Sequence, residues 1–163
     1  MSFEKNLIVL GKDRLDTEKF RKIKNKIYKN KPEGGLWTSP EKSNWGWKDF
    51  VISEKFLENY YLSGNLIFIT LKDSAKIYKI DSEFDFMSCP FRNKTKEECE
   101  ICKFSFLDFE KLSEKYDALW ITERAINENS SWICSEDRLL GPLYGWDVET
   151  VLLFNLECIE SYA

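Results

Sequence analysis

The sequence predicts a single domain of the α+β class, and three observations support this prediction. At 163 residues the chain is long enough to bury one hydrophobic core without disulfide or metal staples. Hydrophobic residues make up 43% and aromatic residues 15% of it, which favours a packed globule over a disordered chain. Short apolar runs typical of strands are interspersed with segments of helical periodicity. We find no repeat, low-complexity tract or linker, so the predicted domain covers residues 1–163.

The segment up to residue 60 is expected to contain two strands and two helices. Asn6 to Leu10 is a short apolar run that predicts a buried strand. A helix is predicted to begin near Asp16 or Thr17 and to end by Lys31, before Pro32, with an apolar stripe and lysines on its other faces. The stripe consists of Phe20, Ile23 and Ile27. A strand over 36–39 and a helix over 47–59 follow.

The chain after residue 60 is expected to be richer in strands. Strands are predicted over 65–71 and 75–80, with a turn at 72–74 between them. Residues 81–104 are predicted to form an irregular, cysteine-containing insertion, followed by an amphipathic helix over 106–116 and a strand over 117–122. Residues 123–141 are expected to be mostly loop, with 132–134 as a short strand, and a strong strand is predicted over 148–155. The total is about seven strands and three helices.

The charge pattern excludes several classes of site. The chain has no histidine, so Ser-His-Asp triads, Cys-His dyads and histidine-ligated metals are excluded. Residues 1–31 carry a net charge of +6, whereas the remainder carries −10. Such a basic segment can contact phosphate or an acidic partner, or it can be the solvated face of a helix. No apolar run approaches the ~20 residues of a membrane span and the N-terminus lacks signal-peptide features, so we expect a cytoplasmic protein.

Residues 31–50 are rich in tryptophan, glycine and proline, and this composition predicts a segment that frames a pocket. The segment contains three of the six tryptophans, including Trp37 and Trp47. Tryptophan buries a large area and carries one polar N–H group, so it is used in cores and on binding surfaces. Both interpretations apply to Trp37 and Trp47.

The five cysteines leave two interpretations open. Cys99-x-x-Cys102 has the spacing of half a zinc site, with Cys89 and Cys134 as third and fourth ligands of a structural zinc. The alternative is a set of free, reduced cysteines that behave as small apolar residues. A redox function for Cys99-x-x-Cys102 is disfavoured because the strand–helix context of that motif is missing.

The order of the predicted elements resembles the ADP-ribosyltransferase family. In that family a first strand, a glycine-turned second strand and a late strand with a catalytic glutamate form the NAD site. The matching places here are 10–12 (Leu-Gly-Lys), 34–39 (Gly-Gly-Leu-Trp-Thr-Ser) and Glu149. The resemblance implies an α+β domain with split antiparallel or mixed sheets. Segments 34–40 and 145–151 are also similar to small phage and mobile-element proteins, which implies an effector that acts in the cytoplasm of a host cell.

The resemblance also implies roles for individual residues. Glu149 would be the catalytic carboxylate, oriented by Ser39 or Thr38, in transfer of ADP-ribose from NAD to a host protein or nucleic acid. The remaining candidates would bind NAD. Because the family's first-strand histidine is absent, Lys12 or Arg14 would take its place; the full set is Gly11, Lys12, Arg14, Trp37, Thr38, Trp47 and Arg124.

Each of these assignments has a structural alternative. Glu149 can be a surface carboxylate, Ser39 a turn residue before proline, and Arg124 a capping or salt-bridge residue. Two further functions also stay open. The protein can be a non-enzymatic inhibitor that binds and blocks a host defence protein, or a nucleic-acid binder that uses the basic residues between Lys19 and Lys31.

Overall fold

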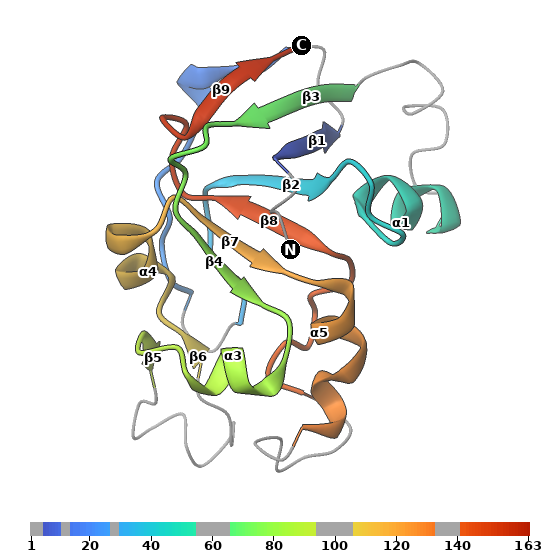
Figure 1. Ribbon diagram of the computed structural model, residues 1–163, viewed down its shortest axis with the longest axis vertical. Coiled ribbons are helices and arrows are strands. Elements are labelled where there is room, and N and C mark those ends of the chain that lie inside the picture. Colours follow the sequence, from blue (N-terminus) through green and yellow to red (C-terminus); the bar gives the residue numbers. More distant parts are fainter. Residues whose placement is uncertain (1–4, 11–13, 27–29, 55–65, 94–105, 133–140) are drawn as a thin grey trace.

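A seven-stranded mixed sheet forms the centre of the computed structural model (Figure 1). The structure describes residues 5–10, 14–26, 30–54, 66–93, 106–132 and 141–163. Strand order is β4-β7-β8-β2-β1-β3-β9, and every neighbouring pair is antiparallel except β4 and β7. The strands are β1 (Asn6–Leu10), β2 (Leu36–Pro40), β3 (Leu66–Leu71), β4 (Ile77–Ile80), β7 (Ala118–Ile121), β8 (Thr150–Leu153) and β9 (Ile159–Tyr162). A separate pair joins β5 (Arg92–Asn93) to β6 (Phe106–Leu107). The predicted α+β class is confirmed as one mixed domain of helices and strands.

Strand β2 joins the two halves of the large sheet. Its first three residues pair with β8, where Thr38 lies opposite Val151. Its last two pair with β1, where Ser39 lies opposite Ile8. Strand β2 therefore exchanges β8 for β1 as its pairing partner after its third residue. The strands on either side of it thus belong to one continuous sheet.

Within the described residues four α-helices flank the sheet: α1 (Trp47–Glu54), α3 (Glu83–Met87), α4 (Phe109–Lys115) and α5 (Glu123–Glu128). Three of them begin with a polar side chain that accepts a hydrogen bond from the backbone of the first turn. These caps are Ser82, Asp108 and Thr122. Such caps satisfy N–H groups that have no partner within the helix.

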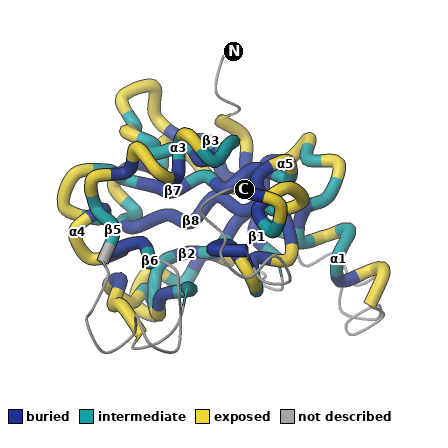
Figure 2. The backbone as a smooth tube through the Cα atoms, turned by 90° about the horizontal axis from the view of Figure 1, so that it is seen from below, coloured by how far each residue is buried: buried dark blue, intermediate teal, exposed yellow. Residues whose placement is uncertain are grey.

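Buried apolar side chains form two clusters on opposite faces of the sheet. Along β8, Leu152 belongs to the first cluster, whereas Val151 and Leu153 belong to the second. Neighbouring strand residues point to opposite faces, so the clusters occupy the two sides. Helices α3, α4 and α5 supply the first cluster, and β1 and β3 supply much of the second. Figure 2 shows the central strands as the buried part of the fold, with exposed segments around them.

The helix predicted over 16–31 is wrong. Only Thr17–Lys19 forms a single 3₁₀ turn, and the chain then runs extended beside residues 33–35, with Lys24 and Glu33 exchanging two backbone hydrogen bonds. Of residues 21–26 only Ile23 is buried. One buried side chain in an extended segment takes the place of the helical stripe of Phe20, Ile23 and Ile27 from which the helix was predicted.

The other sequence predictions agree in part. Strands are present within all six of the longer predicted strand segments, although most are shorter than predicted. The loop predicted over 123–141 is wrong for its first residues, which form α5. The segment 81–104, predicted to be irregular, contains α3. The capping box of Ser82 with Asp85 explains α3, because each side chain accepts from the other residue's backbone N–H. Residues 27–29, 55–59, 65, 94–104 and 133–140 of these predictions lie outside the described residues.

Candidate ligand pocket

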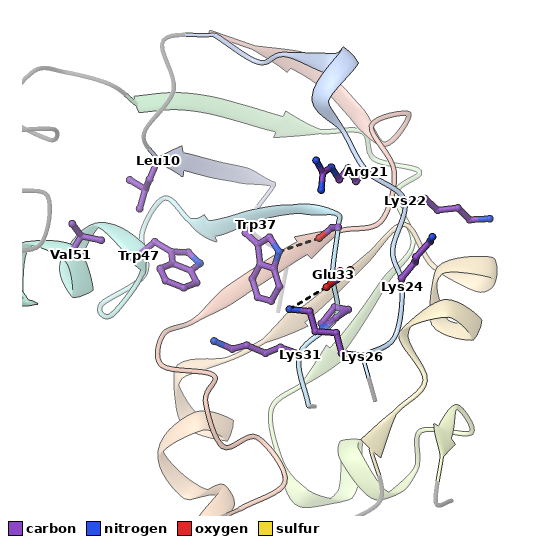
Figure 3. Close-up of a pocket in the computed structure, with 12 residues that line it drawn as sticks. Leu10, Arg21, Lys22, Lys24, Lys26, Lys31, Glu33, Trp37, Trp47 and Val51 are labelled. Atoms are coloured by element: carbon purple, nitrogen blue, oxygen red, sulfur yellow. Dashed lines mark hydrogen bonds and ion pairs between the residues drawn. The ribbon is translucent and has the colours of Figure 1, made fainter. Parts of the chain in front are cut away.

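A cavity of about 1100 Å³ lies beside β2, between α1 and the extended segment 21–26 (Figure 3). Five of its lining residues are basic and one, Glu33, is acidic. Two tryptophan side chains, Trp37 and Trp47, form aromatic walls. Among the described residues, the lining consists of Leu10, Arg21, Lys22, Lys24, Lys26, Lys31, Pro32, Glu33, Gly34, Trp37, Trp47 and Val51. The pocket is therefore strongly cationic, although the whole chain has a net charge of −4.

Two glycines bring the basic segment against β2. Gly34 and Gly35 have φ angles of 80° and 71°, in the left-handed region that side chains disfavour. A Cβ atom on Gly34 would lie 2.3 Å from the backbone oxygen of Lys22. The Gly35 amide donates to the carbonyl of Arg21 across a 2.8 Å hydrogen bond. The glycine pair thus permits the close backbone contact that places Arg21 and Lys22 at the pocket.

Asn25 anchors the same segment from its inner side. Its side-chain amide donates to Asp108 at 2.9 Å, and its side-chain oxygen accepts from the backbone of Phe109 at 2.8 Å. Because side chains alternate along an extended chain, the Asn25 side chain lies on the side of α4, while Lys24 and Lys26 lie on the other side of the backbone; all three residues are exposed. The segment is thus attached to α4 by polar contacts and presents its lysines outward.

Trp37 lies at the centre of the aromatic wall. Its ring centroid is 5.2 Å from that of Trp146 and 6.5 Å from that of Trp47. Its indole N–H donates to the carbonyl of Gly34 at 3.1 Å, which fixes the orientation of the ring (Figure 3). The Nζ atom of Lys31 lies 5.8 Å from the centroid of Trp37. A fixed aromatic surface with an ammonium group next to it is a typical cation–π arrangement.

Lys31 is half-buried, and burial lowers the pKa of its ammonium group below the usual lysine value. Asp147, whose carboxylate is 3.8 Å from Nζ, opposes this effect by stabilising the charged form. Burial is the larger influence. The pocket therefore holds one cation that is less well solvated than a surface lysine, and such a cation gains more from an added anion.

Trp47 is attached to β2 through its backbone, because its N–H donates to the hydroxyl of Ser39 at 2.9 Å. Its indole Nε1 is buried and has no hydrogen-bond partner among the described residues. Its ring packs edge-on against Trp37 and Phe50. Trp47 thus extends the aromatic wall from β2 to α1.

Glu149, the predicted catalytic carboxylate, is not among the residues that line this pocket. One of its carboxylate oxygens accepts from the hydroxyl of Ser43 at 2.5 Å and the other from the indole of Trp120 at 2.9 Å. Glu149 directly precedes β8, three residues before Leu152, the partner of Trp37. An odd spacing along a strand reverses the face, so the Glu149 and Trp37 side chains lie on opposite faces of the sheet.

Ser39 and Thr38 are fully buried and bind backbone groups rather than the Glu149 carboxylate. The Ser39 hydroxyl donates to the Glu149 carbonyl at 2.9 Å, and the Thr38 hydroxyl donates to the Val151 carbonyl at 2.6 Å. The prediction that one of them orients the carboxylate is wrong, since Ser43 makes that contact. The sequence reasoning did not single out Ser43.

The two predicted arginines do not line the pocket. Arg124 lies in the first turn of α5 and forms ion pairs with Asp81 at 3.5 Å and Glu128 at 3.3 Å, which agrees with its alternative interpretation as a salt-bridge residue. Arg14 is exposed in the segment before the 3₁₀ turn. Gly11 and Lys12 lie outside the described residues.

Only one of the four predicted zinc ligands can be located. Cys89 is buried after α3, and burial raises the pKa of its thiol. Cys99, Cys102 and Cys134 lie outside the described residues. In the part of the chain that the structure describes, no three cysteine or acidic residues gather as a metal would require.

Trp37 and Trp47 were predicted as pocket residues, and the basic residues between Lys19 and Lys31 as a nucleic-acid face, but the two groups were not predicted to lie in one pocket. The available signal was the alternation of lysines at positions 22, 24 and 26, which places them on one side of an extended chain. The helical interpretation of this segment dispersed them over several faces.

Comparisons of the chain with protein-family models, curated proteins and solved structures found no match. Within the described ranges, none of the helices has the length and apolar character needed to cross a membrane.

Proposed function

We propose that the protein binds a nucleotide-type ligand, an aromatic base that carries phosphate groups, in the cationic pocket. The observation that supports this proposal is the combination of Arg21 and Lys31 with Trp37 and Trp47 in one cavity. Bases stack on aromatic side chains with about 1–3 kcal/mol per base, and ammonium and guanidinium groups bind phosphate through charge-assisted hydrogen bonds. Neither feature alone would favour this ligand class as strongly.

In this proposal the aromatic side chains of the pocket bind the base and the basic side chains bind the phosphates. Trp37 is held in orientation by its bond to Gly34 and offers a base a fixed surface. Lys31, whose ammonium lies 5.8 Å from the Trp37 ring, and Arg21, which lines the same cavity, are the cations for the phosphates, and Arg21 has the bidentate geometry that phosphate favours. The cavity of about 1100 Å³ slightly exceeds the usual range of small-molecule sites, about 300–1,000 Å³, so it accommodates a dinucleotide such as NAD.

Calorimetric titration of the purified protein with ADP and with NAD tests this proposal. We expect saturable binding that weakens about tenfold in the Lys31→Gln variant, the equivalent of about 1.4 kcal/mol. Lys48→Gln is the matched control, because Lys48 is exposed on α1 and does not line the pocket. Absence of binding by both ligands, or equal losses in the two variants, would contradict the proposal.

ADP-ribosyl transfer, the activity implied by the family resemblance, is a second candidate. It is supported by the fixed carboxylate of Glu149, whose two oxygens accept from Ser43 and Trp120. It requires the nicotinamide ribose to reach Glu149 on the face of the sheet opposite Trp37. Transfer of label from NAD to a host protein or nucleic acid in a cell lysate, abolished by Glu149→Ala, is its expected result.

The non-enzymatic alternative makes a different prediction. A protein that blocks a host defence protein would form a stoichiometric complex that neither NAD nor Glu149→Ala affects. Size-exclusion chromatography of the protein with lysate, followed by identification of the co-eluting partner, distinguishes this outcome from transfer. Complex formation that requires NAD would contradict it.

A further inference from the structure

The cationic lining extends beyond the space that one nucleotide needs. Lys22, Lys24 and Lys26 are exposed and line the pocket from the extended segment. Figure 3 shows Lys22 and Lys24 pointing away from the two indoles. A mononucleotide stacked on Trp37 cannot contact this whole row, so the row has no role in the simple nucleotide site.

The spacing of the row suits a repeating anion. Residues on one side of an extended chain are separated by two positions, about 6.6 Å per step. The row is held in place, because Lys24 pairs with Glu33 through two backbone hydrogen bonds and Asn25 is bonded to Asp108 and Phe109. Three lysines are thus held at even backbone spacing, and the Lys26 ammonium also lies 3.7 Å from the carboxylate of Glu33, an ion pair with which a phosphate would compete.

From this arrangement we infer that the natural occupant is a single-stranded nucleic acid. One base stacks on Trp37, and the phosphates that follow it in the strand run along Lys22, Lys24 and Lys26. This inference rests on the proposed nucleotide site and names its substrate class. Proteins that bind single strands combine these two parts, a positively charged groove for the backbone and aromatic side chains for the bases.

The aromatic wall distinguishes this occupant from other polyanions. A base of a single strand can leave its neighbours and stack on Trp37, whereas bases in a duplex are already stacked on one another. An acidic peptide would supply carboxylates to the lysines but no comparable aromatic faces to the indoles. Duplex DNA and polyglutamate are therefore the appropriate competing ligands.

The charge distribution makes a quantitative prediction. The lining side chains have a net charge of +4, counted as five basic residues and one acidic residue, on a chain of net charge −4. Binding of a polyanion therefore depends on this local surface rather than on the overall charge. Single strands lose affinity with a log–log salt slope of about −0.7 per neutralised phosphate, so removal of three lysine contacts should reduce the slope by about 2.

Fluorescence anisotropy with a labelled oligothymidylate of about eight nucleotides tests the inference, with ADP measured in parallel by calorimetry. The key variant carries Lys22→Gln, Lys24→Gln and Lys26→Gln. Its control carries Lys42→Gln, Lys48→Gln and Lys76→Gln, which removes the same charge at exposed positions outside the pocket lining. Both variants keep the backbone contacts that organise the segment.

We expect the oligonucleotide to bind at least tenfold more tightly than ADP. The variant at Lys22, Lys24 and Lys26 should lose this advantage and show a salt slope reduced by about 2, while its affinity for ADP changes little. The control variant should retain most of the oligonucleotide affinity and most of the salt slope. Equal affinity for ADP and the oligonucleotide would overturn the inference but leave the proposed nucleotide site intact. Equal binding of duplex DNA or polyglutamate would also overturn it. Failure of both ADP and the oligonucleotide to bind would refute the nucleotide site itself.

Discussion

The ammonium group of Lys31 lies 5.8 Å from the centroid of the Trp37 ring. Lys31 belongs to the segment before the glycine turn, whereas Trp37 belongs to β2, so the turn brings the charge and the aromatic surface together. Lys31 also lies 5.9 Å from the ring centroid of Trp146. In our account, this cation beside two aromatic rings makes the pocket selective for a ligand that has both a base and a phosphate group.

The affinity for ADP should fall as the pH rises, and Lys31 should determine where the fall begins. Burial lowers the pKa of Lys31 from the ordinary value of 10.5, so it loses its charge at lower pH than an exposed lysine. The charged form binds phosphate, so its contribution is complete below the lowered pKa and is lost above it. Calorimetry across this range should show a later fall for Lys31→Arg, because arginine stays charged. The same profile in Lys31→Arg and wild type would contradict this role.

Alanine at Gly34 should destabilise the fold more than alanine at Gly145. Both glycines have positive φ, so both substitutions carry a conformational cost of about 1–2 kcal/mol. At Gly34 the added Cβ also meets the backbone oxygen of Lys22 at 2.3 Å, whereas the nearest heavy atom at Gly145 is 3.9 Å away. Chemical denaturation should give the larger loss of unfolding free energy for Gly34→Ala. Equal losses would show that the close backbone contact is unimportant.

Glu149→Gln should reduce stability without changing the affinity for ADP. Both carboxylate oxygens accept hydrogen bonds, from Ser43 and Trp120, and a glutamine amide would direct its NH₂ group at one of these donors. We expect a loss of about 1 kcal/mol, since a mismatched pair leaves a donor unsatisfied. Denaturation curves and ADP titrations of the variant check both parts. A large loss of ADP affinity would instead place Glu149 in the binding site.

The free energy of unfolding should fall between pH 9 and pH 11 in part because of Cys158. Burial raises the pKa of its thiol from 9.0 to about 11, and its S–H group donates to the carbonyl of Asn155. The protonated thiol is favoured in the folded state, so its stabilisation is complete below pH 9 and is lost as the pH rises to 11. Cys158→Ser, which does not ionise in this range, should show a shallower fall. Identical pH dependence in both proteins would refute this assignment.

The sequence identified the strands more accurately than the helices. Runs such as 66–71 and 150–153 consist mainly of apolar β-forming residues; the second is buried on both sides of the sheet and the first on one, and this burial explains the agreement. Segment 20–27 was misinterpreted because Phe20, Ile23 and Ile27 fit a helical stripe. The partners that hold this segment extended, Glu33 and Asp108, are distant in the sequence, so local periodicity could not reveal them.

The candidate site was predictable only in its aromatic part. Trp37 and Trp47 lie in one glycine-flanked segment, and this proximity in sequence indicated a pocket. The contribution of Arg21 depends on a backbone contact with Gly35, which the sequence does not show. The position of Glu149 relative to Trp37 likewise depends on strand register, in which one residue of shift reverses the face.

The most direct test of the nucleotide site is the indole N–H region of a two-dimensional ¹⁵N–¹H NMR spectrum during titration with ADP. The six tryptophans give distinguishable signals, and single Trp→Phe variants assign them. Our account predicts large, saturable shifts for Trp37 and Trp47, and little change for Trp132, which packs against Phe86 in the core beneath α3. Saturable binding that leaves the Trp37 and Trp47 signals unchanged, or no binding at millimolar ADP, would contradict the account.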